Sequence, residues 1–285
     1  MKKKILILGG SSFLGSNLFY LLNKKYDVYL TRNTSNKNNY NKSIYFKNKK
    51  KIININLNKK LELSNIYFKT VINCIGNTKN YNKKNYNLRK SNYLLKKNLL
   101  FLNKLNFEVL LHISSSMIYG YSSKKFHENS ICKPKTKYAK FKYKEETLMS
   151  KVSNNNKKII FLRLFSIFGK SNKKNSIYEM IKNNKKIIIN NPNHQFDLIS
   201  IKYFSQIIDK VILFKNKINN NEIINCCSGI GITPMYLLNL INKNTNISIK
   251  KNKKKTKQVG NNKKLLKLLK LKKFNLINEI KYKYS

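Results

Sequence analysis

The sequence has no tryptophan and, among 285 residues, only three prolines, nine glycines and four cysteines. Cys74, Cys132, Cys226 and Cys227 form no CxxC pair and have no histidine at metal-ligand spacing, which argues against a disulfide framework and a zinc site. No apolar run approaches the roughly 18 residues of a membrane span. The apolar run that follows Met1-Lys-Lys-Lys is too short for a signal peptide. We therefore expect a cytoplasmic chain with free thiols.

Acidic residues are scarce as well, since 11 Asp and Glu oppose 60 Lys and Arg for a formal net charge of +49. Such a balance would suit a nucleic-acid partner. However, arginine, which makes bidentate contacts to bases and phosphates, occurs only at Arg32, Arg89 and Arg163. The lysines are dispersed and Ala139 is the sole alanine, a bias typical of an AT-rich genome. We predict a solvated basic surface that attracts anionic substrates at low salt, with an RNA-associated protein as the alternative.

Short apolar runs alternate with longer segments of helical period, which predicts an α/β fold with a parallel sheet covered on both faces. The expected strands lie at residues 5–8, 28–30, 71–75, 109–113 and 159–165. The expected helices begin near Gly15 and span 86–105 and 138–152. Asn- and Lys-rich loops are expected at 33–51, 154–158, 171–175 and 183–191, and a solvated connector at 249–264. The leucines of 263–274 predict a terminal helix docked on the domain, or alternatively a membrane-surface helix.

Three of the nine glycines, Gly9, Gly10 and Gly15, follow the first apolar run directly. A strand, a glycine turn and a helix N-terminus together form a phosphate-binding loop, because backbone amides and the helix dipole point at the anion. An ordinary tight turn is the alternative. The position at the start of the sequence favours a dinucleotide-binding unit.

The pattern Tyr-x-x-x-Lys, expected in a reductase with such a fold, occurs seven times because both residues are abundant. It starts at Tyr20, Tyr45, Tyr86, Tyr93, Tyr121, Tyr138 and Tyr178. Only Tyr138 opens a helical stretch after a strand that ends in Ser114-Ser115-Ser116. Tyr138 and Lys142 would share one helix face, near the strand ends where parallel sheets bind ligands.

Together these motifs resemble the extended short-chain dehydrogenases/reductases, the NAD-dependent epimerase/dehydratase family of nucleotide-sugar enzymes. Seven segments match in order: the glycine loop 9–15, the strand 71–76, Asn92 with Asn98, the serine strand 112–120, the helix with Pro134, Tyr138, Lys142 and Glu146, the strand 163–169 and the segment 196–201. The resemblance implies a Rossmann-like doubly wound parallel sheet in residues 1–165. It also implies a smaller C-terminal substrate-binding region in 166–285, with segments near 196–215 returning to the sheet.

The resemblance further implies a catalytic trio of Ser115, Tyr138 and Lys142. The charge of Lys142 would lower the pKa of Tyr138 from about 10, so that the tyrosine can exchange a proton with the sugar oxygen that Ser115 holds. The implied cofactor-binding residues are Gly9, Ser12, Phe13, Leu14, Gly15, Arg32, Asn56, Leu57, Cys74, Ile75, Gly76, Asn92, Tyr138 and Lys142. The implied substrate-binding residues are Ser115, Ser116, Met117 and Ser166. No metal is implied, and the histidines, including His112, are expected to be structural or solvated.

Departures from the family pattern bear on specificity. Ser12 replaces the middle glycine of the loop, and Ser116-Met117 stands where 4,6-dehydratases carry Asp-Glu. The second strand ends in Thr31-Arg32-Asn33 without the acidic residue of NAD-specific members. Because Arg32 could clamp a 2′-phosphate, we expect NADP rather than NAD, and a 4-keto-sugar reductase that makes building blocks for surface polysaccharides. The alternatives are an NAD-dependent 4-epimerase and a non-catalytic dinucleotide sensor, and a homodimer stays open.

Overall fold

A seven-stranded sheet forms the centre of the computed structural model, which describes residues 2–33, 52–55, 66–77, 85–152, 157–169, 187–189, 191–241, 247–249 and 255–284. The strand order is β10-β6-β5-β4-β1-β2-β3, and every neighbouring pair is parallel. The strands are β1 (Lys4–Leu8), β2 (Asp27–Asn33), β3 (Ile52–Ile55), β4 (Tyr67–Asn73), β5 (Asn106–Ser115), β6 (Lys158–Leu164) and β10 (Glu222–Cys226).

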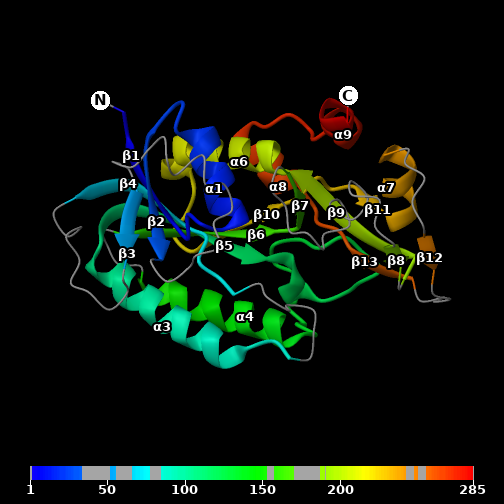
Figure 1. Ribbon diagram of the computed structural model, residues 1–285, viewed down its shortest axis with the longest axis horizontal. Coiled ribbons are helices and arrows are strands. Elements are labelled where there is room, and N and C mark those ends of the chain that lie inside the picture. Colours follow the sequence, from blue (N-terminus) through cyan, green and yellow to red (C-terminus); the bar gives the residue numbers. More distant parts are fainter. Residues whose placement is uncertain are drawn as a thin grey trace.

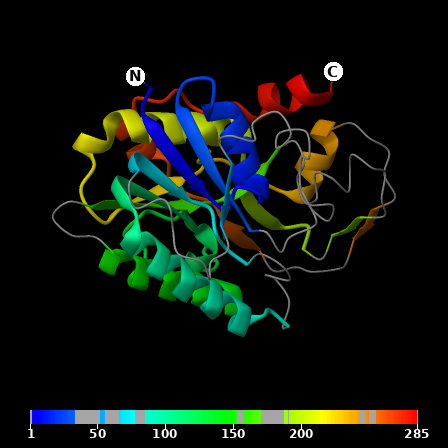
Figure 2. The same ribbon diagram turned by 60° about the vertical axis from the view of Figure 1, so that its left-hand side comes forward.

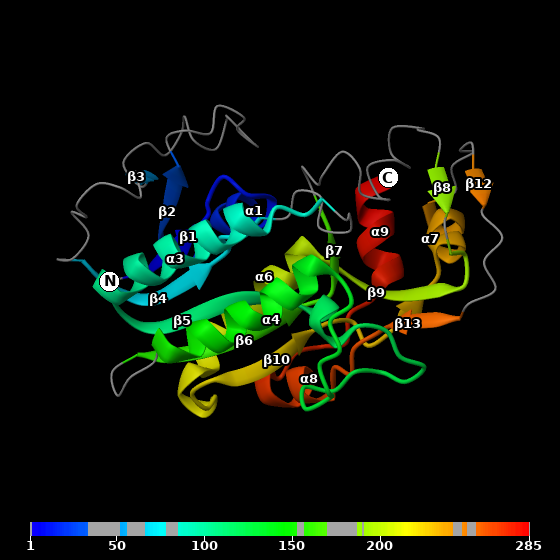
Figure 3. The same cartoon turned by 90° about the horizontal axis from the view of Figure 1, so that it is seen from below.

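Helices cover both faces of this sheet (Figure 1). One face carries α1 (Phe13–Leu22), α6 (Ile201–Phe214) and α8 (Lys263–Leu269), and the other carries α3 (Leu88–Lys104) and α4 (Lys137–Met149). Seen from below, α3 and α4 lie side by side across the sheet (Figure 3). The sheet has the doubly wound, Rossmann-like arrangement that the sequence predicts.

Strand β1 shows why its sequence is an unbroken apolar run. Ile5 and Ile7 belong to the core cluster under α1 and α6. Leu6 and Leu8 belong to the cluster under α3 and α4 on the opposite face. Successive side chains of a strand point to opposite faces, so a strand buried on both sides needs apolar residues at every position.

The order of the strands positions the site. From β1 the chain adds β2 and β3 on one side, and then β4, β5 and β6 on the other. The loops that leave the carboxyl ends of β1 and β4 therefore diverge at a topological switch point, which is where open α/β sheets bind their ligands.

A smaller region lies beyond the carboxyl edge of the large sheet (Figure 2). Its elements are β7 (Ser166–Phe168), β8 (Ile187–Ile189), β9 (His194–Ser200), β11 (Gly231–Ile232), α7 (Pro234–Ile241), β12 (Ile247–Ile249), β13 (Thr256–Gln258) and α9 (Leu276–Tyr284). Between β9 and β11 the chain returns to the large sheet, where α6 contacts α1 and β10 pairs with β6. The division of the chain at residue 165 stays a prediction.

The expectation of a solvated connector at 249–264 is wrong for its described stretch, 255–264. This segment contains β13, and Val259 is 1% exposed. Its backbone is paired with a distant part of the chain, since Phe126 N donates to Val259 O at 2.8 Å. The loop expected at 183–191 likewise contains β8, which pairs with β12. Composition missed both because their hydrogen-bond partners are remote in sequence.

The remaining expectations about local structure meet different outcomes. Helix α1 begins at Phe13, slightly earlier than expected, because the side chain of Ser12 caps it. The predicted docking of the terminal leucines is confirmed by Leu265 and Leu269, which are fully buried, although the helix ends at Leu269. The loop at 171–175 and most of 33–51 and 154–158 lie outside the described residues. None of the described helices combines the length and the apolar composition that a membrane span requires.

Candidate active site

The loop between β1 and α1 closes tightly because it contains glycine at two contact points. Gly9 has φ +77°, and a Cβ there would lie 3.0 Å from the carbonyl carbon of Cys74. A Cβ on Gly15 would lie 2.4 Å from Gly9 O. Side chains at either position would push the loop away from β4 and from the start of α1.

Some backbone amides of this loop donate hydrogen bonds to nearby side chains, and others have no acceptor among the described residues. Gly9 N donates to Thr31 Oγ1 at 3.1 Å, and Gly15 N donates to Ser12 Oγ at 3.0 Å. Among the described residues, no group accepts a hydrogen bond from the amides of Phe13 and Leu14 in the first turn of α1. Free amides at a helix N-terminus are donors for an anion such as a phosphate. Ser12 therefore acts here as a helix cap.

The segment after β4 forms the neighbouring wall. Burial raises the pKa of the Cys74 thiol to about 12, and the positive charge of Lys142 partly opposes that rise. This places Cys74 within electrostatic reach of Lys142. A Cβ built on Gly76 would meet nothing within 4 Å, so the wall is open there.

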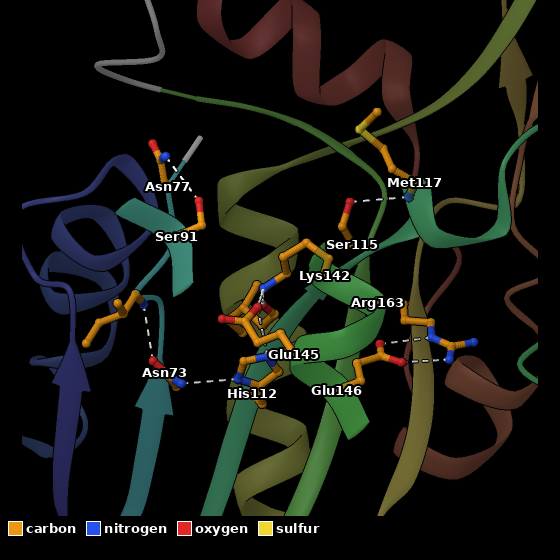
Figure 4. Close-up of polar contacts among 12 residues, drawn as sticks. Asn73, Asn77, Ser91, His112, Ser115, Met117, Lys142, Glu145, Glu146 and Arg163 are labelled. Atoms are coloured by element: carbon orange, nitrogen blue, oxygen red, sulfur yellow. Dashed lines mark hydrogen bonds and ion pairs between the residues drawn. The ribbon is translucent and has the colours of Figure 1, made fainter. Parts of the chain in front are cut away.

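Ser115 is the last residue of β5, at the carboxyl edge of the sheet. Its Oγ accepts a hydrogen bond from Met117 N at 3.2 Å and caps the short 3-10 helix η2 (Ser116–Tyr119) (Figure 4). This bond uses the hydroxyl oxygen as acceptor, so the hydroxyl hydrogen can still be donated to a ligand.

Helix α4 brings Tyr138 and Lys142 to the same edge. Thr136 caps the helix by accepting from Ala139 N at 3.1 Å. The ring of Tyr138 is nearly buried and packs edge-on against Tyr86, with 5.6 Å between ring centroids. Lys142 Nζ donates to the carbonyl oxygen of Ile113 at 3.0 Å. This bond crosses from α4 to β5 and holds the lysine two residues from Ser115.

Lys142 is charged although it is buried. Burial would lower its pKa, but the carboxylate of Glu145 and the Tyr138 side chain raise it above its ordinary value. Burial would raise the pKa of Glu145, but Lys142 and His112 lower it to about 2. Opposite charges thus stabilise each other next to the predicted proton donor.

The model of the NAD dependent epimerase/dehydratase family matches residues 5–227, which include the glycine loop, Ser115 and the Tyr138–Lys142 pair. The chain belongs to this family of enzymes.

Solved structures agree with the family assignment in their fold. A UDP-glucuronic acid 4-epimerase from Bacillus cereus, in complex with UDP-glucuronic acid and NAD, gives a TM-score of 0.79 at 18% identity, covering 99% of this chain and 98% of that one. A UDP-N-acetylglucosamine 4-epimerase from Methanobrevibacter ruminantium M1, in complex with UDP-N-acetylmuramic acid, gives a TM-score of 0.77 at 17% identity. The match covers 100% of this chain and 97% of that one. A dTDP-glucose 4,6-dehydratase from Bacillus anthracis str. Ames, in complex with NAD, gives a TM-score of 0.77 at 15% identity. The match covers 98% of this chain and 94% of that one. No curated protein matches the sequence.

Several other site residues are predicted for this family member. Asn92 is exposed on α3. Ser166 is exposed at the start of β7. Arg32 belongs to β2, and its side chain lies outside the description, as do Asn56 and Leu57 entirely. The cofactor roles of Asn92, Arg32, Asn56 and Leu57 and the substrate role of Ser166 stay predictions.

Sequence reasoning missed a buried cluster beside α3. Ser91, one residue before Asn92, donates to Tyr86 Oη at 2.8 Å and accepts from Asn77 Nδ2 at 3.2 Å. Tyr86 Oη in turn donates to Asn77 O at 3.0 Å. Through the contact between Tyr86 and Tyr138, this cluster supports the predicted catalytic ring. No sequence signal marks it, because its members are short polar residues in a chain rich in Asn and Tyr.

Sequence reasoning also missed Glu145, and it treated His112 as structural. His112 Nε2 lies 3.5 Å from Glu145 Oε2, and Glu145 pairs with Lys142. One signal was available, because Glu145 follows Lys142 by three residues and therefore shares its helix face. His112 precedes Ser115 on the same strand.

Proposed function

We propose that this chain is an NAD(P)-dependent oxidoreductase or epimerase that transfers hydride at a ring carbon of a nucleotide sugar, using Ser115, Tyr138 and Lys142. The observation that carries this proposal is the 3.0 Å hydrogen bond from Lys142 Nζ to Ile113 O. It connects the helix of the Tyr138–Lys142 pair to the strand that ends in Ser115. Membership of the family supports the reaction class.

The residues around the glycine loop fit a dinucleotide. The free amides of Phe13 and Leu14 suit a pyrophosphate, and the close approach at Gly9 leaves the loop flat against the wall formed by Cys74. A nicotinamide dinucleotide bound there would supply or accept the hydride. We propose NAD first, because the Bacillus cereus 4-epimerase and the Bacillus anthracis dehydratase were solved with NAD. The prediction of NADP rests on Arg32 alone.

In this proposal the three side chains move and hold protons. Tyr138 donates a proton to the sugar oxygen during reduction and takes one during oxidation. The ammonium group of Lys142 stabilises the phenolate form of that tyrosine. Ser115 donates its free hydroxyl hydrogen to the reacting oxygen and holds it near Tyr138.

The same trio serves a reductase and an epimerase. A reductase consumes one reduced cofactor per product, whereas an epimerase oxidises and then reduces the same sugar without net consumption. The expectation of a 4-keto-sugar reductase rests on Arg32, and the two 4-epimerases with this fold support the other candidate. A non-catalytic sensor would bind the dinucleotide without turning over any sugar.

The decisive variant is Tyr138→Phe, which removes the proton donor and leaves the ring. We expect it to bind NADH as the wild type does and to lose turnover by roughly a hundredfold or more. Turnover is measured with UDP-glucuronic acid, UDP-N-acetylglucosamine and a 4-keto sugar nucleotide, each with NAD(H) and NADP(H), following cofactor absorbance and sugar products.

Tyr143→Phe is the matched control, because Tyr143 lies on the same helix and is 44% exposed. It should keep wild-type turnover. Near-normal turnover of Tyr138→Phe would sink the proposal. Consumption of reduced cofactor identifies a reductase, and isomerisation without net consumption identifies an epimerase.

A further inference from the structure

A chain of buried polar side chains runs from the end of β4 through β5 to α4 (Figure 4). Its members are Asn73, His112, Glu145 and Lys142, which are 0%, 0%, 2% and 4% exposed. Burying two charges and two polar groups away from water is costly unless they satisfy each other. The arrangement therefore calls for a reason beyond packing.

Hydrogen bonds fix the direction of this chain. Asn73 Oδ1 accepts from Ile75 N at 3.2 Å, so its amide nitrogen is the atom facing His112 Nδ1, 3.1 Å away. The amide nitrogen donates, and Nδ1 accepts. Because Nδ1 accepts, a ring hydrogen is on Nε2, which lies 3.5 Å from Glu145 Oε2. In the described structure Nε2 has no hydrogen-bond partner of its own besides this contact.

Glu145 lies between His112 and Lys142. Its Oε2 atom pairs with Lys142 Nζ, and the same ammonium group donates to Ile113 O. The carboxylate holds the lysine from one side, and the carbonyl oxygen holds it from another. His112 Nε2 approaches the same carboxylate oxygen, Oε2.

We propose that Glu145, oriented by His112, is a positioning residue that keeps Lys142 charged and directed toward the reacting centre. The proposal deepens the proposed function and rests on it for its consequence in turnover. Glu145 acts through Lys142 and touches neither cofactor nor sugar in this scheme.

Among the titratable groups that face Lys142 in the described residues, Glu145 is the one that serves as its counter-ion. In the described part of the chain, the titratable groups that act on Lys142 or its partner are Glu145, Glu146 and Tyr138 of α4, His112 of β5, Tyr86 before α3 and Cys74 after β4. Glu146 is already engaged by Arg163 through two hydrogen bonds. Burial keeps the Cys74 thiol and the Tyr86 phenol protonated, since it raises the pKa of each.

The first test needs no ligand. Urea unfolding of the wild type and Glu145→Gln is followed between about pH 6 and pH 10, which brackets the range in which a lysine with a lowered pKa would titrate. Glutamine keeps the shape of Glu145 and removes its charge. We expect the urea midpoint of the variant to fall furthest below that of the wild type near about pH 6, and this loss to shrink by half or more as the pH rises.

The direction of this pH dependence follows from proton linkage. Without its counter-ion, buried Lys142 has a lower pKa in the folded state than in the unfolded chain. The folded state then binds fewer protons, so its stability rises with pH between the two pKa values. The double variant Glu145→Gln/Lys142→Met has no ammonium group, so its midpoint loss should not change with pH. A loss for Glu145→Gln that is equally independent of pH overturns the proposal.

The reciprocal variant, Lys142→Met, serves if Glu145→Gln does not fold. It leaves Glu145 buried without a cation, which raises the folded-state pKa of the carboxyl. Stability is then lost as the pH rises above about 4.3, the unfolded value for Glu. A midpoint loss that grows from acid toward neutral pH supports the pairing, and a constant loss overturns it.

The second test is the pH profile of turnover, with UDP-glucuronic acid or UDP-N-acetylglucosamine, whichever the wild type converts. Wild-type kcat should fall on the alkaline side only where Tyr138 or Lys142 loses its proton. Glu145→Gln should lose kcat at a pH at least about one unit lower, with KM for the sugar changed less than about twofold. Glu145→Asp, which keeps a carboxylate, should lose kcat at the same alkaline pH as the wild type.

The two proposals fail separately. If Tyr138→Phe is inactive and Glu145→Gln loses kcat equally at every pH, the positioning role fails and the proposed function stands. If Tyr138→Phe is fully active, the proposed function fails, and the unfolding series still decides whether Glu145 sets the charge of Lys142.

Discussion

Gly15 shows how the absence of one Cβ shapes the cofactor end of the sheet. Its ideal Cβ would lie 2.4 Å from Gly9 O and 2.9 Å from Gly10 Cα. Both neighbours are backbone atoms, so they cannot rotate away as a side chain would. The first turn of α1 and the end of β1 can approach each other only with glycine at this position.

Gly15→Ala should therefore open the loop. Alanine gains about 0.5–1 kcal/mol over glycine inside a helix, but a backbone clash costs about 1–3 kcal/mol, so we expect net destabilisation and weaker NADH binding. Urea unfolding and NADH fluorescence titration measure the two effects. Gly76→Ala is the control for stability, because its Cβ meets nothing within 4 Å. Equal losses of stability in the two variants would refute the steric argument.

At the scale of the element, buried polar contacts fasten α4 to the sheet. Lys142 bonds to β5, and Glu146 receives two hydrogen bonds from Arg163 of β6, at 3.1 and 2.8 Å. The guanidinium group of Arg163 also lies 4.8 Å from the ring centre of Tyr119. The position of the predicted proton donor thus depends on charges that sit outside the trio.

Removing one partner of the Glu146–Arg163 pair should be severe, because the other charge stays buried and unpaired. We expect Glu146→Leu or Arg163→Met to cost about 3–5 kcal/mol of unfolding free energy each, and the double variant to cost less than their sum. Lys25→Ala is the comparison, since Lys25 pairs with Asp209 at the surface and should cost at most about 1 kcal/mol. Additive losses from the two buried residues would contradict the pairing.

At the scale of the whole molecule, net charge opposes folding. With 60 basic and 11 acidic residues, 49 positive charges stay without a carboxylate even if every acid were paired. Repulsion between such charges destabilises the compact state. Salt shortens its range from about 30 Å at 0.01 M to about 8 Å at 0.15 M.

Added sodium chloride should accordingly stabilise this protein. We expect Tm to rise by a few degrees between roughly 0.01 and 0.15 M salt, as repulsion is screened. Differential scanning calorimetry measures the change, and glycerol at matched osmolality controls for uncharged solute effects. A Tm that falls with salt would mean that attractive ion pairs outweigh repulsion.

Different parts of the molecule were predictable to different degrees. The unbroken apolar run of β1 predicted a strand buried on both faces, because side-chain alternation is a local property. The segment around Val259 was mispredicted, because lysines and asparagines near it resemble a solvated loop while its hydrogen-bond partner is Phe126. The cofactor role of Asn92 stays a prediction, whereas no sequence pattern marked buried Ser91, which bonds to Tyr86 and Asn77.

By itself, the sequence determined the alternation of strand and helix and the glycine turn after β1, and it predicted Tyr138 among seven equivalent patterns. These features depend on residues close together in the chain, where periodicity and turn chemistry act directly. Only the tertiary structure decided that Asn73, His112 and Glu145 meet beside Lys142. That meeting joins β4, β5 and α4, and the buried charges of Glu145 and Lys142 persist because packing places each beside the other.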